Sequence, residues 1–181
     1  MDHETTECIR DLEDDWDAGR FKNFYFPHPE HMEESHTSTV YMVQFSGQNL
    51  ISGGRDRSIR IWNLETQGLV LPPLLGHEPS VLCAQFDESH EQDILISGGV
   101  DTHILIWQFS TGKLVKNIRK AHSGSILSLK FNNRYIVTGP KDKTIKIWDR
   151  KALDIAATLS STTESPLQLS PAMTCKTTLL L

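Results

Sequence analysis

Residues 52–62 read SGGRDRSIRIW, and this stretch decides the fold because close variants of it recur at 97–107 and 138–148. Each copy starts with a hydroxyl side chain, carries an aspartate four residues later and ends on a tryptophan. A histidine stands upstream of each copy. These marker residues are His36, Ser52, Asp56 and Trp62, then His77, Ser97, Asp101 and Trp107, then His122, Thr138, Asp142 and Trp148. The sequence therefore contains three repeats, each about 41 to 45 residues long.

Between the markers the residues alternate in polarity or are continuously apolar, as strands require. We expect four strands in each repeat. First strands are predicted at 40–45, 81–86 and 126–131, second strands at 49–52, 94–97 and 135–138, third strands at 58–62, 103–107 and 144–148, and fourth strands at 69–75, 113–118 and 152–159. Glycine between the second and third strands permits a tight turn. Four short strands in such a repeat are typical of a propeller blade.

The markers make residues 36–159 similar to the WD-repeat β-propeller family. The literal Trp-Asp pair occurs at Trp148-Asp149, and the literal Gly-His pair at Gly76-His77. The resemblance implies an all-β fold, namely a partial WD-repeat β-propeller whose three four-stranded blades form an unclosed arc. The repeats are expected at 36–76, 77–121 and 122–159. Propellers close with about 4 to 8 blades, so three blades leave the ring open.

A narrower resemblance links the chain to the F-box/WD-repeat proteins of fungi. It rests on 52–62, on the Pro72-Pro73 linker and on 76–83, with Trp16-Asp17-Ala18-Gly19 matching the segment that joins an F-box to the first blade. Residues 1–15 are too few for an F-box. The resemblance implies a protein-binding part of the substrate-recognition subunit of an SCF-type cullin–RING ubiquitin ligase. The alternative is a WD-repeat scaffold in another assembly, such as RNA processing or chromatin.

The repeated hydroxyl, histidine and aspartate favour a structural role over a catalytic triad, because a triad needs one unique site with an oxyanion hole. In the family these residues and the tryptophan form a hydrogen-bonded tetrad inside each blade. The histidines of His28-Pro29-Glu30-His31 lack the spacing of a helical zinc motif, and Pro29 opposes a helix there. We therefore expect no enzyme activity, no metal and no cofactor.

The family resemblance places partner-binding residues on the top face of the arc, just before each turn aspartate and at the start of each first strand. The first set comprises Arg55, Val100 and Lys141, and the second comprises Thr39, Tyr41, Ser80, Leu82, Ser125 and Leu127. Arg55 and Lys141 suit a phosphorylated or acidic peptide, although ordinary solvated charges are the simpler interpretation. Val100 interrupts this series of cations. By strand alternation, Arg60 and Lys146 are expected to be solvated.

The charge of the chain is uneven. The 181 residues carry a net charge of −5, of which residues 1–35 hold 11 acidic and 3 basic side chains and therefore −8. The remaining +3 is too weak to indicate a nucleic-acid partner. No apolar run is long enough for a membrane span, and three cysteines without paired spacing favour a reducing compartment, the cytoplasm or the nucleus.

Both ends differ from the repeats. Residues 1–35 are expected to form an irregular acidic leader with one edge strand at 21–26, and 160–181 a disordered tail rich in serine and threonine. A truncated gene product would explain the small number of repeats. An open arc also exposes the faces of its terminal blades, through which copies of the chain can self-associate.

Overall fold

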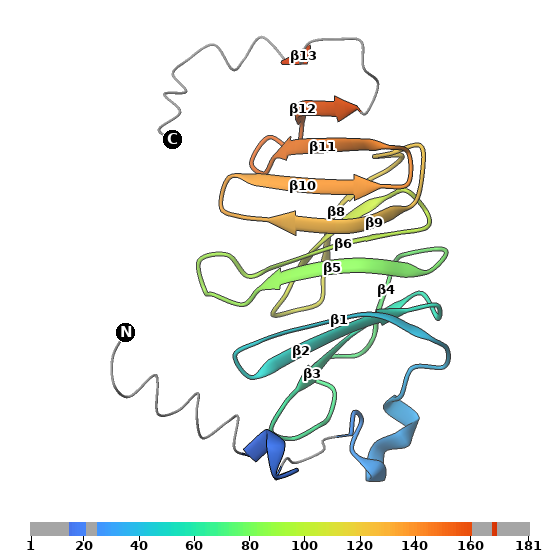
Figure 1. Cartoon of the computed structure of the whole chain (residues 1–181), viewed down its shortest axis with the longest axis vertical. Coiled ribbons are helices and arrows are strands. Elements are labelled where there is room, and N and C mark those ends of the chain that lie inside the picture. The colour runs from blue at the N-terminus through green and yellow to red at the C-terminus, as the bar shows by residue number, and fades with distance from the viewer. Residues whose placement is uncertain (1–14, 21–24, 161–167, 170–181) are drawn as a thin grey trace.

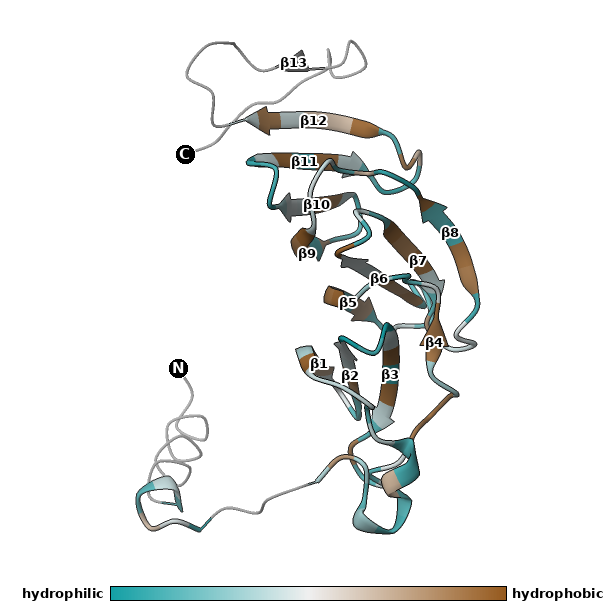
Figure 2. Cartoon of the chain, turned by 90° about the vertical axis from the view of Figure 1, so that its right-hand side faces the viewer, coloured by the Kyte–Doolittle hydropathy of each residue, from teal (hydrophilic) through white to brown (hydrophobic). Residues whose placement is uncertain are grey.

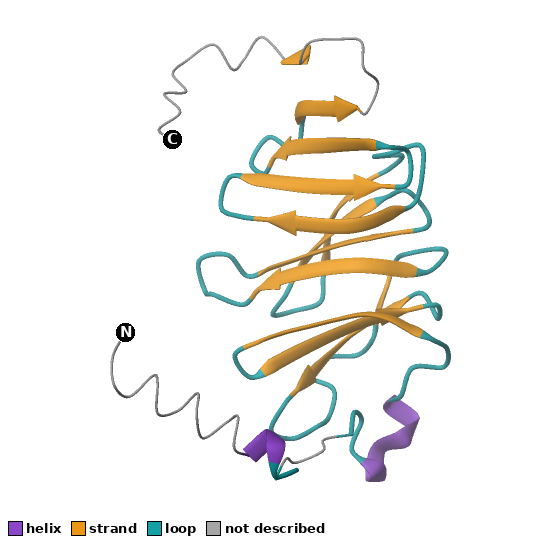
Figure 3. Cartoon of the chain, in the orientation of Figure 1, coloured by secondary structure: helices purple, strands orange, loops and turns teal. Residues whose placement is uncertain are grey.

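The computed structural model describes residues 15–20, 25–160 and 168–169. Nearly all of its regular structure is β-strand, arranged as three antiparallel sheets side by side (Figures 1 and 3). The sheets follow one another along a curved arc, with β1, β5 and β9 on its inner side and β4, β8 and β12 on its outer side (Figure 2). The prediction of an open partial propeller is therefore confirmed.

Each sheet is one blade, with its strands hydrogen-bonded in chain order. The first blade comprises β1 (Val40–Ser46), β2 (Asn49–Gly54), β3 (Ser58–Asn63) and β4 (Leu74–Leu75); the second comprises β5 (Val81–Asp87), β6 (Ile94–Gly99), β7 (Ile104–Gln108) and β8 (Leu114–Ile118); the third comprises β9 (Ile126–Phe131), β10 (Tyr135–Pro140), β11 (Thr144–Asp149) and β12 (Ile155–Ser160). Among the described residues, no helix is both long and apolar enough to cross a membrane.

The outer strands depart most from the prediction. In place of a strand over 69–75, β4 has two residues, and Leu69 makes only an isolated bridge to Trp62. The reason is that Pro72 and Pro73 have no N–H to donate to a neighbouring strand. The expected strand at 152–159 begins instead at Ile155, after a turn that Asp149 stabilises by accepting hydrogen bonds from the N–H groups of the next residues.

The terminal segments also differ from expectation. Pro29–Glu34 form a 3-10 helix, η1. Of the edge strand expected at 21–26, residues 21–24 lie outside the described residues, and Tyr25 and Phe26 are not in a strand. Instead, Phe26 packs edge-on against Trp62, with ring centroids 6.4 Å apart. In the tail, where no strand was expected, Gln168–Leu169 form β13 beside β12; residues 161–167 and 170–181 lie outside the described residues.

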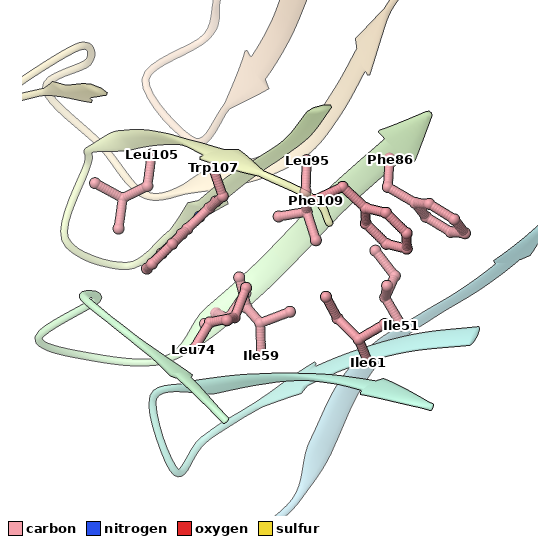
Figure 4. Close-up of a cluster of buried hydrophobic side chains, with 10 residues drawn as sticks. Ile51, Ile59, Ile61, Leu74, Phe86, Leu95, Leu105, Trp107 and Phe109 are labelled. Atoms are coloured by element: carbon pink, nitrogen blue, oxygen red, sulfur yellow. The ribbon is translucent and has the colours of Figure 1, made fainter. Parts of the chain in front are cut away.

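The hydrophobic core lies between the blades. We call the side of a blade that points toward the next blade its trailing face, and the opposite side its leading face. On the trailing face of the first blade, Ile51, Ile59 and Ile61 are at most 1% exposed (Figure 4). They pack against the leading face of the second blade, where Phe86 and Trp107 are buried. A second cluster joins the second and third blades in the same way.

The strand period of two explains this division. Opposed residues in neighbouring strands share a face, so the register Ile51↔Ile61 and Gly53↔Ile59 places these residues together on the trailing face. The register Leu95↔Trp107 places the second pair on the leading face of its blade. A one-residue slip in register would exchange the two faces, so the packing on both sides of a blade sets its register.

The core packing gives a direct prediction. Ile104→Ala should lower the free energy of unfolding by about 2–5 kcal/mol, because Ile104 is fully buried between blades and its truncation leaves a cavity. As a control, Val115→Ala should change it by less than about 0.5 kcal/mol, since Val115 is 63% exposed on β8. Urea denaturation followed by circular dichroism measures both. Equal effects of the two substitutions would contradict the assignment of the core.

Candidate functional site

The four marker residues of the second repeat form one hydrogen-bonded chain. His77 Nδ1 lies 2.7 Å from Asp101 Oδ2, and His77 Nε2 lies 2.8 Å from Ser97 Oγ. The indole N–H of Trp107 donates to the same Ser97 Oγ at 3.0 Å. Because a carboxylate only accepts, the histidine donates through Nδ1 and accepts the serine hydroxyl proton at Nε2. Each of the four polar side chains of this tetrad thereby has a hydrogen-bond partner.

The other two repeats build the same arrangement. In the first, the His36–Asp56, His36–Ser52 and Trp62–Ser52 distances are 2.8, 2.7 and 2.8 Å. In the third, the corresponding distances around His122 and Thr138 are 3.2 Å to the aspartate, 2.7 Å between the two residues and 3.1 Å to the tryptophan. The structure thus brings together all the residues that the sequence pattern singled out in each repeat.

The electrostatics of these tetrads favours a neutral histidine beside an ionised aspartate. Burial lowers the pKa of His36 below its usual value of 6.5, and outweighs the opposing effect of Asp56. Burial also lowers the pKa of His122, with a further contribution from the charge of Lys146. Although burial alone would raise the pKa of Asp56, hydrogen bonds from Ser58 and His36 hold it below its usual value.

The geometry of the tetrads suits a structural role and not nucleophilic catalysis. A nucleophilic hydroxyl must reach a substrate, but Ser52, Ser97 and Thr138 are at most 4% exposed. Each hydroxyl is also occupied, since its oxygen accepts from a tryptophan and it bonds a histidine. The described residues contain no group of three or more histidine, cysteine or carboxylate side chains that could hold a metal.

Two cations expected in solvent lie instead between structural elements. Arg60 is 7% exposed, and its guanidinium lies 3.6 Å from Asp56 of the first tetrad. Lys146 is half-buried and donates from Nζ to the carbonyl oxygen of Ala121 at 2.6 Å. The expectation was wrong because β3 and β11 are central strands. Their leading faces carry the tetrads, and there Arg60 meets Asp56 and Lys146 meets the carbonyl oxygen of Ala121, so alternation does not lead to solvent.

The predicted partner-binding residues lie at the rim where the turns between the second and third strands meet the starts of the first strands. The backbone joins them in pairs: Arg55 N–H donates to Thr39 O at 2.8 Å, and Lys141 N–H donates to Ser125 O at 2.8 Å. Val100 pairs with Ser80 in the same way at 3.0 Å. Arg55 and Lys141 are exposed. Tyr41 and Leu127 are also exposed, whereas Leu82 is partly buried.

Three further cations lie on this rim that the sequence pattern did not single out as partner-binding residues. Arg57 and Lys143 follow the turn aspartates and have positive φ angles, 69° and 64°, which turns the chain sharply and leaves both side chains exposed. Lys120 lies beside a hollow of about 600 Å³. This hollow is lined by Thr102, Lys120, His122, Ser123, Asp142, Thr144 and Lys146. The signal for Arg57 and Lys143 was their common place one residue after the aspartate.

Comparison with known proteins identifies the repeats. A family model described as "WD domain, G-beta repeat" matches residues 28–63, 69–108 and 112–149. Proteins named mitochondrial division protein 1 from Malassezia globosa and Mycosarcoma maydis are 40% identical to the chain over 70 residues, 37% of this chain. The match covers 10% and 8% of those two proteins, so the chain spans about a tenth of the curated relatives that it matches.

Solved structures resemble the arc as well. The computationally designed Ika8 protein matches 67% of this chain with a TM-score of 0.59 and 27% identity, over 36% of its own length. The designed Ika4 protein matches 63% with a TM-score of 0.56 and 29% identity, over 68% of its own length. The WD40 β-propeller domain of Doa1 matches 71% with a TM-score of 0.62; at 23% identity over 42% of that chain, it shows the fold alone.

The tetrads predict a specific cost of removing a turn aspartate. Asp101→Ala removes the acceptor of the His77 N–H and frees the His77 ring to turn away from Ser97. The free energy of unfolding should therefore fall by roughly 1–3 kcal/mol for each buried group left unpaired. Asp154→Ala removes the same charge from an exposed position and should have little effect. Thermal or urea unfolding compares the two. Equal stabilities would show that the tetrad contributes nothing.

The histidines also predict acid sensitivity. Because the pKa values of His36 and His122 are lower in the folded chain than their usual 6.5, the unfolded chain binds more protons once the pH falls below about 6.5. The unfolding temperature should therefore fall between about pH 7 and about pH 5. His122→Gln should reduce this slope, whereas His90→Gln, at an exposed loop position, should keep it. A steeper slope in His122→Gln would contradict the assignment.

Proposed function

The chain belongs to the WD-repeat family, and on that premise we propose that it is a non-catalytic protein-binding module whose top rim takes a phosphorylated or acidic peptide. The observation that carries the proposal is the charge of the three turns between second and third strands. Their exposed charged side chains are all cations, namely Arg55, Arg57, Lys141 and Lys143.

The acidic residues of the same turns do not cancel this charge locally at the surface. The side chains of Asp56, Asp101 and Asp142 are 6%, 4% and 11% exposed, and each is held by the histidine of its tetrad. The tetrads therefore draw the carboxylates inward while the neighbouring cations point outward. A planar guanidinium such as that of Arg55 can engage two phosphate oxygens at once.

The rim offers two cationic positions separated by an apolar one. Val100 occupies the equivalent turn of the second blade and is 41% exposed. A peptide that fits this pattern carries an anionic group for Arg55 in the first blade and another for Lys141 in the third, with an apolar side chain between them. Tyr41 and Leu127, both exposed beside these turns, add apolar surface at either end.

Membership of an SCF-type ubiquitin ligase remains a prediction from the resemblance. In the described residues, Asp15–Asp17 form a short helical turn and Trp16 is 76% exposed. An F-box encoded upstream of Trp16 in the genome would support this role, and another domain there would remove its basis. The expected compartments, cytoplasm or nucleus, likewise remain proposals.

A second candidate is a WD-repeat scaffold in a different assembly. The observation that favours it is the 40% identity over 70 residues to the two fungal proteins named mitochondrial division protein 1. Those names favour an assembly at mitochondria over the assemblies in RNA processing or chromatin that the WD-repeat resemblance left open as the alternative. Co-sedimentation of the tagged chain with purified mitochondria would favour this candidate.

The peptide proposal predicts that binding depends on charge and on phosphate. On an array of phosphoserine and phosphothreonine peptides with their unphosphorylated counterparts, the chain should prefer the phosphorylated members. Arg55→Ala should weaken binding to the selected peptide by about 10- to 150-fold, since a charge-assisted hydrogen bond is worth about 1.5–3 kcal/mol.

Two matched variants complete the test by fluorescence polarisation. Arg55→Lys keeps the charge but loses the planar fork, so it should restore binding only in part. Lys113→Ala removes an exposed cation from the β7–β8 turn at the opposite rim and should leave affinity unchanged. Equal affinity of the Arg55→Ala and unchanged chains would remove Arg55 from the site.

A further inference from the structure

We propose that two copies of this chain pair head to tail, trailing face to leading face, and close into a ring of six blades. The inference is independent of the peptide-binding function proposed above. It rests on the two terminal faces of the arc, because each exposes the residues that the internal blade joints bury.

The trailing face of the third blade repeats the apolar surface of the first two blades, but within the described residues no further blade covers it. Its Ile145 takes the place of Ile59 and Ile104, which are both 0% exposed, yet Ile145 is 44% exposed. Val137 takes the place of Ile51 and is 37% exposed. The register Val137↔Ile147 and Ile145↔Leu159 puts these side chains on one face of the sheet.

The leading face of the first blade is the complementary half. Phe45 takes the place of Phe86, which is 4% exposed because the first blade covers it. Phe45 itself is 70% exposed, and Val43 beside it is 61% exposed. Exposed apolar surface of this kind, contiguous on a strand, marks an interaction site.

A glycine notch makes the two halves specific for one another. A side chain at Gly53 would meet Val81 of the next blade at 2.9 Å, and one at Gly98 would meet Ile126 at 2.9 Å. At each internal joint, therefore, a β-branched residue at the start of a first strand fills the space over a glycine. The third member of this series, Gly139 on the third blade, meets only Ser128 of its own sheet, at 3.9 Å.

Val40 is the residue that fits this notch. It takes the place of Val81 and Ile126 at the start of a first strand, and it is 42% exposed where those two are 0% exposed. Val40 of a second copy would therefore cover Gly139 with a β-branched side chain, as Val81 covers Gly53 and Ile126 covers Gly98 within one chain. This match is the reason to assign the face to another copy of the chain.

The outer part of the joint differs from the internal ones. Phe26 and the leader already cover Trp62, which is 2% exposed, so the leader takes the place that an outer strand of a preceding blade would occupy. The joint therefore involves the inner strands, β1 and β2 against β10 and β11. The outer strand β12, with Ala157 as its single buried residue, lies outside this joint.

Blade number explains why two copies suffice. Two arcs of three blades supply six, within the range of about 4 to 8 at which propellers close. Three arcs would supply nine. A head-to-tail contact that did not close would extend into a filament. Closure also places Lys141 of one copy in the blade next to Arg55 of the other, so the second copy contributes a cation to the same candidate rim.

The test is the mass of the full chain in solution, measured by light scattering after size exclusion. We expect about 41 kDa, twice the 20.5 kDa of one chain. Ile145→Glu on the trailing face and Phe45→Glu on the leading face should each give monomers. Val115→Glu, at an exposed position of the middle blade, should remain dimeric.

Mixing the two monomeric variants distinguishes head-to-tail pairing from other arrangements. The Ile145→Glu copy keeps its leading face and the Phe45→Glu copy keeps its trailing face, so an equimolar mixture should recover the dimer mass through one intact joint. Recovery also shows that both variants fold. No recovery, or loss of the dimer in one variant alone, would overturn the head-to-tail arrangement.

Filling the notch gives a variant without added charge. Gly139→Val should be monomeric, because it blocks Val40 of the second copy while the isolated chain has room for the side chain. A dimeric Gly139→Val chain would overturn the notch. An unchanged chain that is monomeric at micromolar concentration, or whose mass grows past two copies, would overturn the ring.

Discussion

The fold depends on the burial of each blade against the next. A four-stranded sheet with apolar residues on both faces cannot cover itself, so its stability comes from its neighbours. Ile59 and Ile104 hold equivalent places on successive blades, and each is buried because the following blade lies over it. The same requirement sets strand register, since a slip would turn the isoleucines away from their partners. It also explains why the terminal faces differ from the internal ones.

The stacking of blades also buries polar side chains, and the tetrads provide these side chains with hydrogen-bond partners. Each histidine joins the turn aspartate to a hydroxyl and a tryptophan deep in the sheet, and so links the rim of the blade to its centre. This link holds the turn in place and keeps its carboxylate inside. The exposed charge of the turns is consequently positive. The structural network and the proposed binding surface are thus two consequences of one local sequence pattern.

The two ends of the arc differ in how much of their apolar surface is covered. At the first blade, Phe26 packs on Trp62, and Leu69 N–H donates to the Glu34 carboxylate at 3.0 Å, so part of the leading face is covered. At the third blade, Ile145 remains 44% exposed. The exposed face of the third blade and the uncovered part of the first blade's leading face, at opposite ends of the arc, are the two surfaces that the proposed pairing would join.

The sequence by itself determined the repeat, the strand order and the membership of each tetrad, because these depend on residue type at a fixed spacing. Tertiary structure alone decided which charges are solvated: strand alternation predicts Arg60 and Lys146 in solvent, but each meets a nearby acceptor, Asp56 or the carbonyl oxygen of Ala121. It also decided the extent of β4, where prolines interrupt the pairing, and the path of Phe26, which packs on a ring distant in the sequence. Spacing records what a residue can do locally, whereas burial depends on which segments meet in space.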